Sequence, residues 1–532
     1  MVEKELMYNY KLFIPTAGIG SRVSNIARNM NKGLIGIDNK PVLSHIVEKF
    51  HPDVDIVVAL GYGGNYVRQY FEIVYPERNF TFVDIENFEG KGSGLGLTVN
   101  SCREHLQCPF VFVSNDTIFE EQLYFDEIPY NWLGYSPIKA GSDYRSLQLD
   151  KDGNVLALND KINNSTNYSY IGICGIKDYK EFWGYMKQKE SLSMGESYGI
   201  EKMLENNISF NSIKFTWYDT GNRYALLKAK EKLKSDHQPN ILEKENEAIW
   251  FANGKTIKFS IDKNFISDRV ERATYLNNYV PEVTNSSENF YVYDFLKGNV
   301  LSKKVTSKKF EYLLYWLDGF WKRVELSKME EKKFLGECLS FYKEKTLSRI
   351  NIYYERYNNI DVDEIVNGNK LVALSDVFDC LDWKWITRGE PVRFHGDLHF
   401  ENILINETND GLPFSLLDWR QNFGGSYEYG DIYYDLAKLY HGLIISHDFI
   451  NKNFYNFSRD MNDVYYDFHR KNTSIECERI LRSYVEKNNL DWKRVKVITA
   501  LIFLNIAGLH HYPYCHLLYY LGRVMLTEES VR

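Results

Sequence analysis

The segment at residues 394–402 places side chains that phosphoryl transfer requires at a short, fixed spacing. Asp397 precedes Asn402 by five positions, and a second aspartate, Asp418, ends an apolar run shortly afterwards. Transfer of a phosphoryl group from ATP needs one carboxylate that orients the attacking hydroxyl, and an amide and a second carboxylate that hold Mg²⁺ against the phosphates. We therefore interpret Asp397 as the base and Asn402 and Asp418 as magnesium ligands.

The apolar residues around these groups predict the structure that brings them together. Residues 402–406 and 414–418 read as two short strands, and an Asn-Asp-Gly sequence at 409–411 predicts the turn between them. A hairpin of this kind brings Asn402 near Asp418. The alternative is that Asp397 lies in a capped loop and that Asp418 only ends a strand.

This motif resembles the aminoglycoside phosphotransferase and choline kinase superfamily of small-molecule kinases, which carry the same His-x-Asp-x-x-x-x-Asn loop and a following Asp-Trp. Further along, Asp431 and Asp435 match the Gly-Asp-Pro-x-x-Asp-Leu-Ala stretch that supports the loop in that family, with Ile432 in place of the proline. The resemblance implies a two-lobed, protein-kinase-like fold with a mostly helical second lobe, and structural roles for both aspartates.

A kinase of this type also needs a lysine on a strand, which reaches the ATP phosphates, and a carboxylate on the next helix, which orients that lysine. Residues 248–261 read as a hairpin that turns at Asn253 and Gly254, with Lys258 on its second strand. Glu271 falls in the helical pattern that follows. We expect Lys258 and Glu271 to bind the nucleotide; the alternative is that both are solvated surface charges.

Residues 291–298 resemble the strand and hinge that join the two lobes in the same kinases, where backbone groups receive adenine. The usual glycine-rich phosphate loop is not visible at residues 240–250. The resemblance therefore implies a short cover over the nucleotide.

Near the N-terminus, a strand followed by glycines suits a second phosphate chemistry. Residues 11–16 form an apolar run, and Gly18, Gly20 and Ser21 turn out of it. Backbone N–H groups in such a turn can surround a phosphate, and the start of a following helix adds positive potential. By itself, so short a Gly-x-Gly also fits a plain strand-to-helix turn.

Together with Arg22 and Lys32, this turn resembles the nucleotidyltransferases that make nucleotide-sugars and CDP-alcohols. Their signature is Gly-x-Gly-x-Arg, then a Pro-Lys before an apolar strand and a Lys-Pro that opens a helix; here Asn31 stands where the first proline is usual. The resemblance implies a doubly wound, Rossmann-like α/β sheet, with Arg22 and Lys32 stabilising the charge of the nucleoside triphosphate.

The remaining parts of that family follow in order along the chain. Lys91, Gly92 and Ser93 resemble the base-binding loop, and Lys161 stands where the family contacts the acceptor phosphate. Asp116 and Asp219 match the two aspartates that hold Mg²⁺, with Mn²⁺ as an alternative ion. Bridging metal would neutralise the α-phosphate and the departing pyrophosphate. Taken alone, Asp219 also fits a turn-capping aspartate.

Length and composition agree with two catalytic domains. At 532 residues the chain exceeds what one hydrophobic core usually supports. A helical pattern rich in lysine and glutamate gives way to a polar stretch after residue 234. We therefore place the nucleotidyltransferase domain at 1–234, a linker at 235–247 and the kinase domain at 248–532.

The overall charge and the cysteines exclude several classes of protein. A net charge of −8 and a pI near 5.9 give no sign of a basic patch, which argues against a nucleic-acid partner. Seven cysteines show neither zinc-site nor disulfide spacing. No apolar run reaches membrane-spanning length, and the first five residues lack a signal-peptide pattern. We expect a cytoplasmic enzyme.

Fusion of the two chemistries suggests consecutive steps, because the phosphomonoester made by a kinase is the acceptor that a nucleotidyltransferase uses. ATP and a sugar or polyol would give a phosphate ester, and CTP or UTP would convert it to an NDP-sugar or CDP-alcohol for cell-surface polysaccharide. One alternative is a choline or ethanolamine kinase joined to a phosphocholine-type cytidylyltransferase, which Arg420 would disfavour if its charge faced a cationic acceptor. The other is a non-catalytic nucleotide-binding scaffold.

Overall fold

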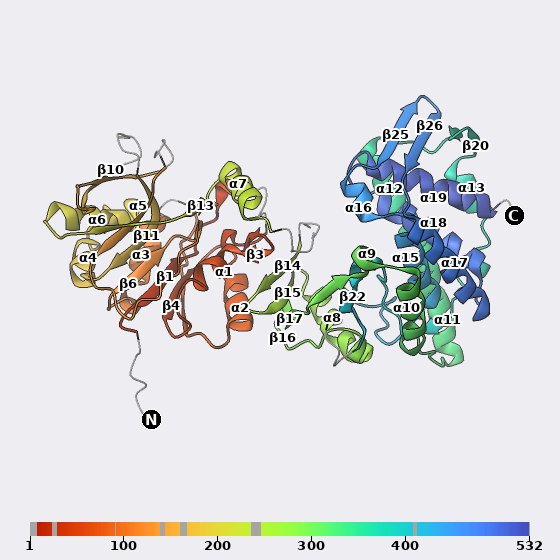
Figure 1. Cartoon of the computed structure of the whole chain (residues 1–532), viewed down its shortest axis with the longest axis horizontal. Coiled ribbons are helices and arrows are strands. Elements are labelled where there is room, and N and C mark those ends of the chain that lie inside the picture. The colour runs from red at the N-terminus through yellow and green to blue at the C-terminus, as the bar shows by residue number, and fades with distance from the viewer. Residues whose placement is uncertain are drawn as a thin grey trace. The chain divides into compact units, whose positions relative to one another are not determined.

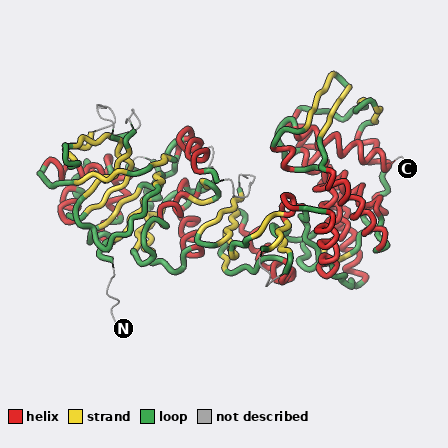
Figure 2. Tube along the Cα trace, in the orientation of Figure 1, coloured by secondary structure: helices red, strands yellow, loops and turns green. Residues whose placement is uncertain are grey.

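The computed structural model describes residues 8–23, 29–90, 92–138, 144–159, 168–235, 246–407 and 412–530. The chain divides into two compact units, which we describe separately (Figure 1). The N-terminal unit comprises Met1–Ile266 and Thr284–Phe295, and the C-terminal unit comprises Ser267–Val283 and Leu296–Arg532. Figure 2 shows strands and helices intermixed in the N-terminal unit and helices prevailing in the C-terminal unit.

The N-terminal unit is built on a nine-stranded sheet with a parallel centre. Along its main path the strand order is β10-β9-β11-β6-β1-β4-β5, and β8 joins β12 to β11. Strands β6, β1, β4 and β5 are parallel, whereas β11 is antiparallel to β6. Their bounds are β1 Lys11–Pro15, β4 Asp55–Leu60, β5 Phe80–Asp84, β6 Phe110–Val113, β8 Trp132–Ser136, β9 Ser146–Leu149, β10 Val155–Asn159, β11 Ser169–Ile176 and β12 Asn211–Lys214.

Both faces of this sheet are covered, as the doubly wound prediction requires. Leu12 and Ile14 of β1 lie in one hydrophobic core and Phe13 in another, so alternate side chains pack on opposite faces. The helices of this unit are α1 Val42–Val47, α2 Gly64–Val74, α3 Leu95–Ser101, α4 Tyr179–Tyr185, α5 Ser191–Met194, α6 Glu196–Glu205 and α7 Arg223–Leu233. The predicted fold class of the N-terminal domain is confirmed.

The strand order also indicates where a ligand could bind. The chain runs from β1 through β4 to β5 on one side and then returns to β6 on the other side of β1. In open sheets of this kind, ligands bind outside the carboxyl ends of the strands where the order reverses. Here that point lies at the ends of β1 and β6, followed by the glycine turn and by Asp116 respectively.

A small antiparallel sheet, β14-β15-β17-β16, completes the N-terminal unit. Asn253 and Gly254 have φ angles of 48° and 67°, so the predicted Asn-Gly hairpin is confirmed. The sheet packs on α2, where the Trp250 ring lies 5.9 Å from that of Tyr70. Its strands are β14 Glu247–Ala252, β15 Lys255–Ser260, β16 Asn285–Ser286 and β17 Phe290–Asp294. Most of the predicted linker at 235–247 lies outside the described residues, and its last residue, Glu247, begins β14. The division between the two catalytic domains stays a prediction.

The C-terminal unit is mostly helical, as predicted for the second kinase lobe. Its central helix, α15 Ile432–Ile444, is buried along almost its whole length. The other helices are the greater part of α8 Lys263–Leu276, then α9 Leu301–Lys304, α10 Ser307–Phe320, α11 Lys328–Leu339, α12 Lys345–Tyr357, α13 Leu374–Cys380, α14 Trp383–Ile386, α16 His447–Asn451, α17 Asn472–Lys487, α18 Trp492–Ala507 and α19 Tyr514–Ser530.

Short sheets hold the loops of the C-terminal unit. The predicted hairpin is present as β22 Ile403–Asn406 and β23 Phe414–Leu416, with β18 Gly298–Val300 on its other side. Strands β21 Pro391–Val392 and β24 Gly430–Asp431 pair ahead of α15. A further sheet has the order β20-β19-β26-β25 and is formed by β19 Glu364–Val366, β20 Asn369–Leu371, β25 Tyr455–Asp460 and β26 Asp463–Phe468.

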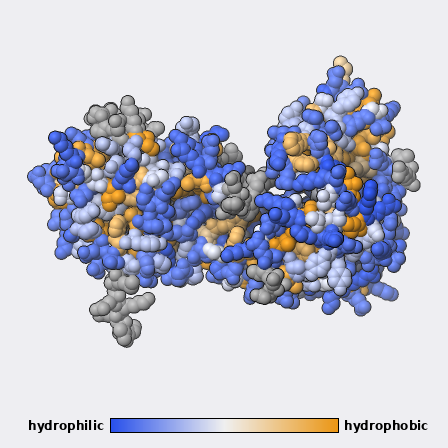
Figure 3. Space-filling view, in the orientation of Figure 1, coloured by the Kyte–Doolittle hydropathy of each residue, from blue (hydrophilic) through white to orange (hydrophobic). Residues whose placement is uncertain are grey.

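The visible face of each unit is largely hydrophilic, with hydrophobic side chains in small scattered patches (Figure 3). Among the helices that the structure describes, none is both long enough and apolar enough to cross a membrane.

Candidate active sites

Asp116 and Lys32 meet at the carboxyl end of the parallel strands in the N-terminal unit. The Lys32 Nζ lies 2.8 Å from Asp116 Oδ2, and the Ser114 hydroxyl donates to Asp116 Oδ1 at 2.5 Å. Burial raises the pKa of Asp116, but the charge of Lys32, these hydrogen bonds and the charge of Arg22 outweigh burial, and the pKa falls to about 2. The carboxylate is therefore ionised at neutral pH.

The second predicted metal ligand, Asp219, is brought to the same place by a short strand pair. Strand β13 Trp217–Asp219 runs antiparallel to β7 Thr117–Phe119, with Asp219 opposite Thr117. Both carboxylates face Gly221: a Cβ at that position would lie 3.0 Å from Asp116 Oδ2 and 3.1 Å from Asp219 Oδ1. Glycine leaves room at this point for the two carboxylates to converge.

The donors at this point fit a magnesium ion. Asp219 Oδ2 accepts a hydrogen bond from the Tyr144 hydroxyl at 2.8 Å, and burial followed by the charge of Asp116 raises the pKa of Asp219. Two converging carboxylates completed by phosphate oxygens and water are a usual environment for Mg²⁺. In the described part of the chain no three His, Cys, Asp or Glu side chains gather as a metal site. The metal-binding roles of Asp116 and Asp219 stay predictions.

The predicted phosphate turn lies against this pair. Gly20 has a φ of +66°, and a Cβ there would lie 3.1 Å from the Lys32 Cβ, so the turn passes close to that lysine. Gly18, Ser21 and Arg22 are exposed, and residues Ser21–Val23 form a 3-10 turn. The positive charge of Arg22 lowers the pKa of both Asp116 and Asp219. The structure thus brings Arg22 and Lys32 together with the two carboxylates.

Asn31, which departs from the family's proline, has a structural explanation. Its buried amide donates to the carbonyl oxygens of Thr16 and Tyr62, at 2.7 Å each, and its Oδ1 accepts from the Gly33 N–H at 2.9 Å. These bonds tie the start of the Lys32–Leu34 3-10 helix to the end of β1. Asn31 therefore fixes the backbone that carries Lys32.

The predicted base-binding loop forms a turn before α3. The Ser93 hydroxyl donates to the Gly90 carbonyl at 2.7 Å, and Gly92 has a φ of +92° with open space around it. Two other predicted site residues, Lys91 and Lys161, lie outside the described residues. Base and acceptor contacts by this group of residues stay predictions.

In the C-terminal unit, two aspartates at the start of α15 support the loop that carries Asp397. Asp435 accepts hydrogen bonds from the backbone N–H groups of His395 and Gly396, at 2.7 Å each. Asp431 accepts from the N–H groups of Glu390 and Tyr433 at 3.0 and 3.2 Å. Burial raises the pKa of each of these two aspartates to about 6. These contacts support the structural roles expected for both.

The hairpin brings the predicted magnesium ligands to the base. Asn402 Nδ2 donates to the Asp397 carbonyl at 3.0 Å and lies 3.4 Å from Asp397 Oδ2, which leaves its amide oxygen available to a metal. Asp418 stands two residues after the end of the second strand and adopts a φ of 55°. It forms an ion pair with Arg269 of α8 at 3.1 Å. An amide oxygen and a carboxylate beside the base fit a Mg²⁺ site; their ligation of metal stays a prediction.

Asp397 is paired with a lysine that the sequence interpretation missed. Lys438 Nζ of α15 lies 2.8 Å from Asp397 Oδ1, and His399 Nε2 lies 3.7 Å from Oδ2. Burial raises the pKa of Asp397, but the charges of Lys438 and His399 lower it by more, so the pKa is well below the ordinary value. The sequence held a signal for Lys438: it stands three residues after Asp435 and so shares its helical face.

Helix α8 contributes a second missed residue, Arg272. Its guanidinium is fully buried and donates to the carbonyl oxygens of Phe394, His395, Arg420 and Tyr427. These acceptors belong to the segments on either side of Asp397 and Asp418. Arg272 therefore cross-links the loop that carries the base to the loop that follows the hairpin.

The predicted nucleotide pair, Lys258 and Glu271, is distributed over the two units. Lys258 is buried in β15 of the N-terminal unit, and Glu271 is exposed on the part of α8 that belongs to the C-terminal unit. Their joint role in ATP binding stays a prediction.

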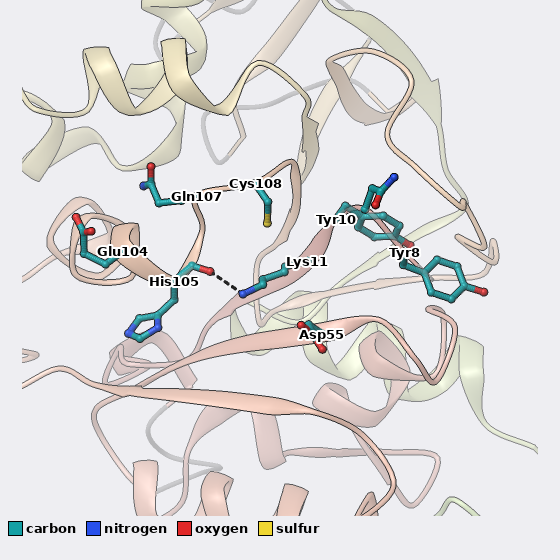
Figure 4. Close-up of a pocket in the computed structure, with 9 residues that line it drawn as sticks. Tyr8, Tyr10, Lys11, Asp55, Glu104, His105, Gln107 and Cys108 are labelled. Atoms are coloured by element: carbon teal, nitrogen blue, oxygen red, sulfur yellow. Dashed lines mark hydrogen bonds between the residues drawn. The ribbon is translucent and has the colours of Figure 1, made fainter. Parts of the chain in front are cut away.

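A pocket of about 260 Å³ in the N-terminal unit lies away from these residues (Figure 4). Lys11, Asp55 and His105 are among its lining residues, and Lys11 Nζ donates to the His105 carbonyl at 3.2 Å. Lys11 and Asp55 begin β1 and β4, so the pocket is at the amino end of the parallel strands. The candidate site is at their carboxyl end.

Comparison with protein families identifies a domain in the C-terminal part of the chain. The model of the phosphotransferase enzyme family matches residues 344–454. This range contains Asp397, Asn402, Asp418 and the supporting aspartates. The predicted kinase-like domain is confirmed.

The N-terminal region matches nucleotidyltransferases. The chain is 25% identical over 240 residues to the bifunctional protein GlmU of Methanocaldococcus jannaschii. This match covers 44% of this chain and 56% of that protein. It is 24% identical over 236 residues to the GlmU protein of Methanococcus vannielii, covering 42% and 55% of the two chains. The chain spans about half the length of these relatives.

Two solved structures show limited likeness to the same region. A CTP:phosphocholine cytidylyltransferase from Streptococcus pneumoniae superposes with a TM-score of 0.38 and 13% identity, over 42% of this chain and 100% of that one. A UDP-glucose pyrophosphorylase from Acinetobacter baumannii gives 0.36 and 12%, over 43% and 94%. At these TM-scores the likeness adds nothing to the sheet topology described above.

Proposed function

We propose that the chain is a bifunctional enzyme that first phosphorylates a small hydroxyl compound and then couples the phosphate to a nucleotide. The C-terminal site would use ATP, and the N-terminal site would use a second nucleoside triphosphate, CTP or UTP. The acceptor class is a sugar or polyol, and the product is an NDP-sugar or CDP-alcohol of the kind used for cell-surface polysaccharide.

In the first step, the acceptor hydroxyl attacks the γ-phosphorus of ATP. An oxygen–phosphorus bond forms, the bond to the β–γ bridging oxygen breaks, ADP leaves with that electron pair, and Asp397 orients the hydroxyl and receives its proton. Asn402 and Asp418 would hold Mg²⁺, which neutralises the phosphate oxygens. A carboxylate held ionised by Lys438 suits a loose transition state, where positioning matters more than basicity.

In the second step, an oxygen of the new phosphate ester attacks the α-phosphorus of the other nucleotide and pyrophosphate leaves. Lys32 and Arg22 supply positive charge where the triphosphate must lie. Asp116 and Asp219 would hold Mg²⁺, which draws the two polyanions together. This step requires no nucleophile from the protein.

The observation that carries the proposal is that each group of charged residues is assembled within one compact unit. Lys32, Asp116 and Asp219 converge in the N-terminal unit, and Asp397, Asn402 and Asp418 converge in the C-terminal unit. A scaffold that only binds nucleotide has no need of two such assemblies.

The test is to incubate the full chain with Mg²⁺, ATP and each of CTP, UTP and GTP, together with a panel of sugars, polyols and amino alcohols, and to identify products by mass. Appearance of a phosphate ester and its nucleotide derivative is the expected result. Isothermal titration with each Mg-nucleotide runs in parallel. Absence of nucleotide binding at both sites would instead support the non-catalytic scaffold.

A further inference from the structure

Several basic side chains gather around Asp397. Lys438 is 8% exposed and occupies one oxygen of Asp397 at 2.8 Å. Lys345, at the start of α12, and Arg420, two residues after Asp418, lie on the same ring: Lys345 Nζ is 4.4 Å and the Arg420 guanidinium carbon 4.5 Å from the Phe341 centroid.

Arg420 is fixed beside the loop that carries the base. A Cβ on Gly396 would lie 2.6 Å from the Arg420 Cβ, and the Arg420 backbone N–H donates to the His395 carbonyl at 3.0 Å. Within the described residues, neither Lys345 nor Arg420 forms an ion pair with a carboxylate. Two cations on one aromatic ring therefore stand close to the base, and neither is in direct contact with a carboxylate of the described residues.

The charges of these groups act strongly on one another. Burial, followed by the charges of Arg420, Arg349 and Lys438, lowers the pKa of Lys345 to about 7, and the charge of Asp397 acts in the opposite direction. Holding positively charged side chains close together costs free energy, and no ligand offsets that cost in the protein without a bound anion. Such clusters are expected where a bound anion supplies the missing negative charge.

A second observation comes from the histidines next to Lys438. His441 is 4% exposed, and neither ring nitrogen has a hydrogen-bond partner among the described residues. Its charge interactions include Lys438, His447, His399 and Asp397, which places it in the same group. A buried imidazole without a partner is costly and suits a site completed by a polar ligand.

From these contacts we infer that the acceptor of the kinase reaction is an anion, a hydroxy compound with a carboxylate or phosphate group that Lys345 and Arg420 bind. The inference rests on the proposed kinase activity of the C-terminal site and narrows its substrate class. The anion would contact the cations on the Phe341 ring while its hydroxyl lies at Asp397. Choline and ethanolamine, which are cations, would be repelled at the same place.

The phosphates of ATP could also supply the negative charge that these cations bind, so the experiment separates the nucleotide from an anionic acceptor. Full-length protein is first saturated with Mg²⁺ and a non-hydrolysable ATP analogue, and inorganic phosphate, glycerate, glycerol and choline are then titrated separately by calorimetry. Phosphate and glycerate should bind, and glycerol and choline should not. Lys345→Gln and Arg420→Gln should each weaken anion binding at least tenfold.

The matched control is Lys343→Gln, because Lys343 stands two residues before Lys345 but lies over the Trp383 ring, 5.3 Å from its centroid. This variant should bind phosphate as the unchanged protein does. Three results would overturn the inference. These are binding of the anions only when the ATP analogue is absent, equal binding of the anions to all variants, and binding of the anions that is weaker than that of choline. Failure of the proposed kinase activity would give a different result. Mg-ATP would then not bind, or would bind equally well to the unchanged protein and to an Asp418→Asn variant.

Discussion

In the N-terminal unit the two carboxylates, Asp116 and Asp219, face two cations, Lys32 and Arg22. In the C-terminal unit Asp397 faces Lys438, Asp418 faces Arg269, and Lys345 and Arg420 lie on the Phe341 ring close by. The first arrangement is balanced and leaves two converging carboxylates for a divalent cation. The second holds two further cations on one aromatic ring, Lys345 and Arg420, whose charge a bound anion would balance. Under the proposed function, the two sites would therefore bind phosphate groups with different arrangements of charge.

The largest effect that tests this comparison comes from Asp397. Asp397→Asn keeps the size of the side chain but removes the proton acceptor, so phosphoryl transfer should fall by about 10²–10⁴-fold. Nucleotidyl transfer to a supplied phosphate ester should be unchanged, as measured by pyrophosphate release. Asp448→Asn is the control, because Asp448 forms its ion pair with Lys471, at 2.9 Å, and not with Lys438 or His399, which pair with Asp397. Equal loss of both activities in a folded Asp397 variant would contradict separate sites.

Lys32→Met should have the next largest effect, on the other site. Removal of a preorganised positive charge from a phosphoryl transition state costs about 2–4 kcal/mol, or roughly 30- to 1,000-fold in rate. Arg22→Met should act in the same direction. Lys49→Met, which removes a lysine bonded to the Glu120 carbonyl at 2.6 Å, is the control and should be silent. Pyrophosphate release at near-normal rate in both active-site variants would show that these cations are ordinary surface charges.

The metal requirement sharpens the comparison further. Asp219→Asn should raise the Mg²⁺ concentration needed for half-maximal nucleotidyl transfer by at least about tenfold, the size of change that even indirect ligand contacts produce. The Mg²⁺ dependence of ADP formation should stay the same. Asp150→Asn, in an exposed turn, serves as the control. A chelator should stop both reactions, and activity that survives chelation at either site would remove the metal from that site.

The smallest effect is on stability and has opposite signs in the two units. The folded pKa of Asp431 is raised from 3.8 to about 6, so the native C-terminal unit binds more protons than the unfolded chain between these values. Its stability therefore falls as pH rises from 4 to 6, by up to about 3 kcal/mol from this group. For Asp116 the pKa is lowered to about 2, so its contribution is present above pH 4 and is lost as pH falls toward 2.

The measurement is the melting temperature of the C-terminal unit, followed from pH 4 to 6.5 in the unchanged protein and in Asp431→Asn. The variant should lose less stability across this range, because its amide does not titrate. Asp435 titrates in both proteins and cancels in the difference. Parallel curves would show that Asp431 does not have the raised pKa.

Much of this architecture could be predicted because the signals are local. The Asn253-Gly254 turn fixes a hairpin through its positive φ angles, and the apolar runs after Asn402 and before Asp418 pair as expected. Continuous apolar runs in β1 and β6 indicate buried parallel strands. Each of these features depends on a few neighbouring residues, so no knowledge of the tertiary structure was needed.

The features that were missed depend on packing between distant segments. Arg272 and Lys345 look like ordinary helix charges in the sequence, and only the fold shows that one is buried against four carbonyl groups and the other stacks on Phe341. Trp250 gave no sign that its sheet would share a core with α2. The motif located the base, but the cations around it, Arg420, Lys438 and Lys345, stand 23, 41 and 52 positions away in the sequence.

The ring of Phe341 has a further consequence for how the C-terminal site responds to its medium. A carboxylate would neutralise Lys345 and Arg420, but an aromatic face attracts cations and leaves their charge intact. No internal ion pair has to break when an anion arrives, so competition comes from dissolved ions instead. At 0.15 M salt the screening length is about 8 Å. Dissolved ions weaken the attraction of partly exposed charges for a ligand more than that of buried, paired charges. Ionic strength should therefore tune the first reaction more than the second, whose cations already have carboxylate partners.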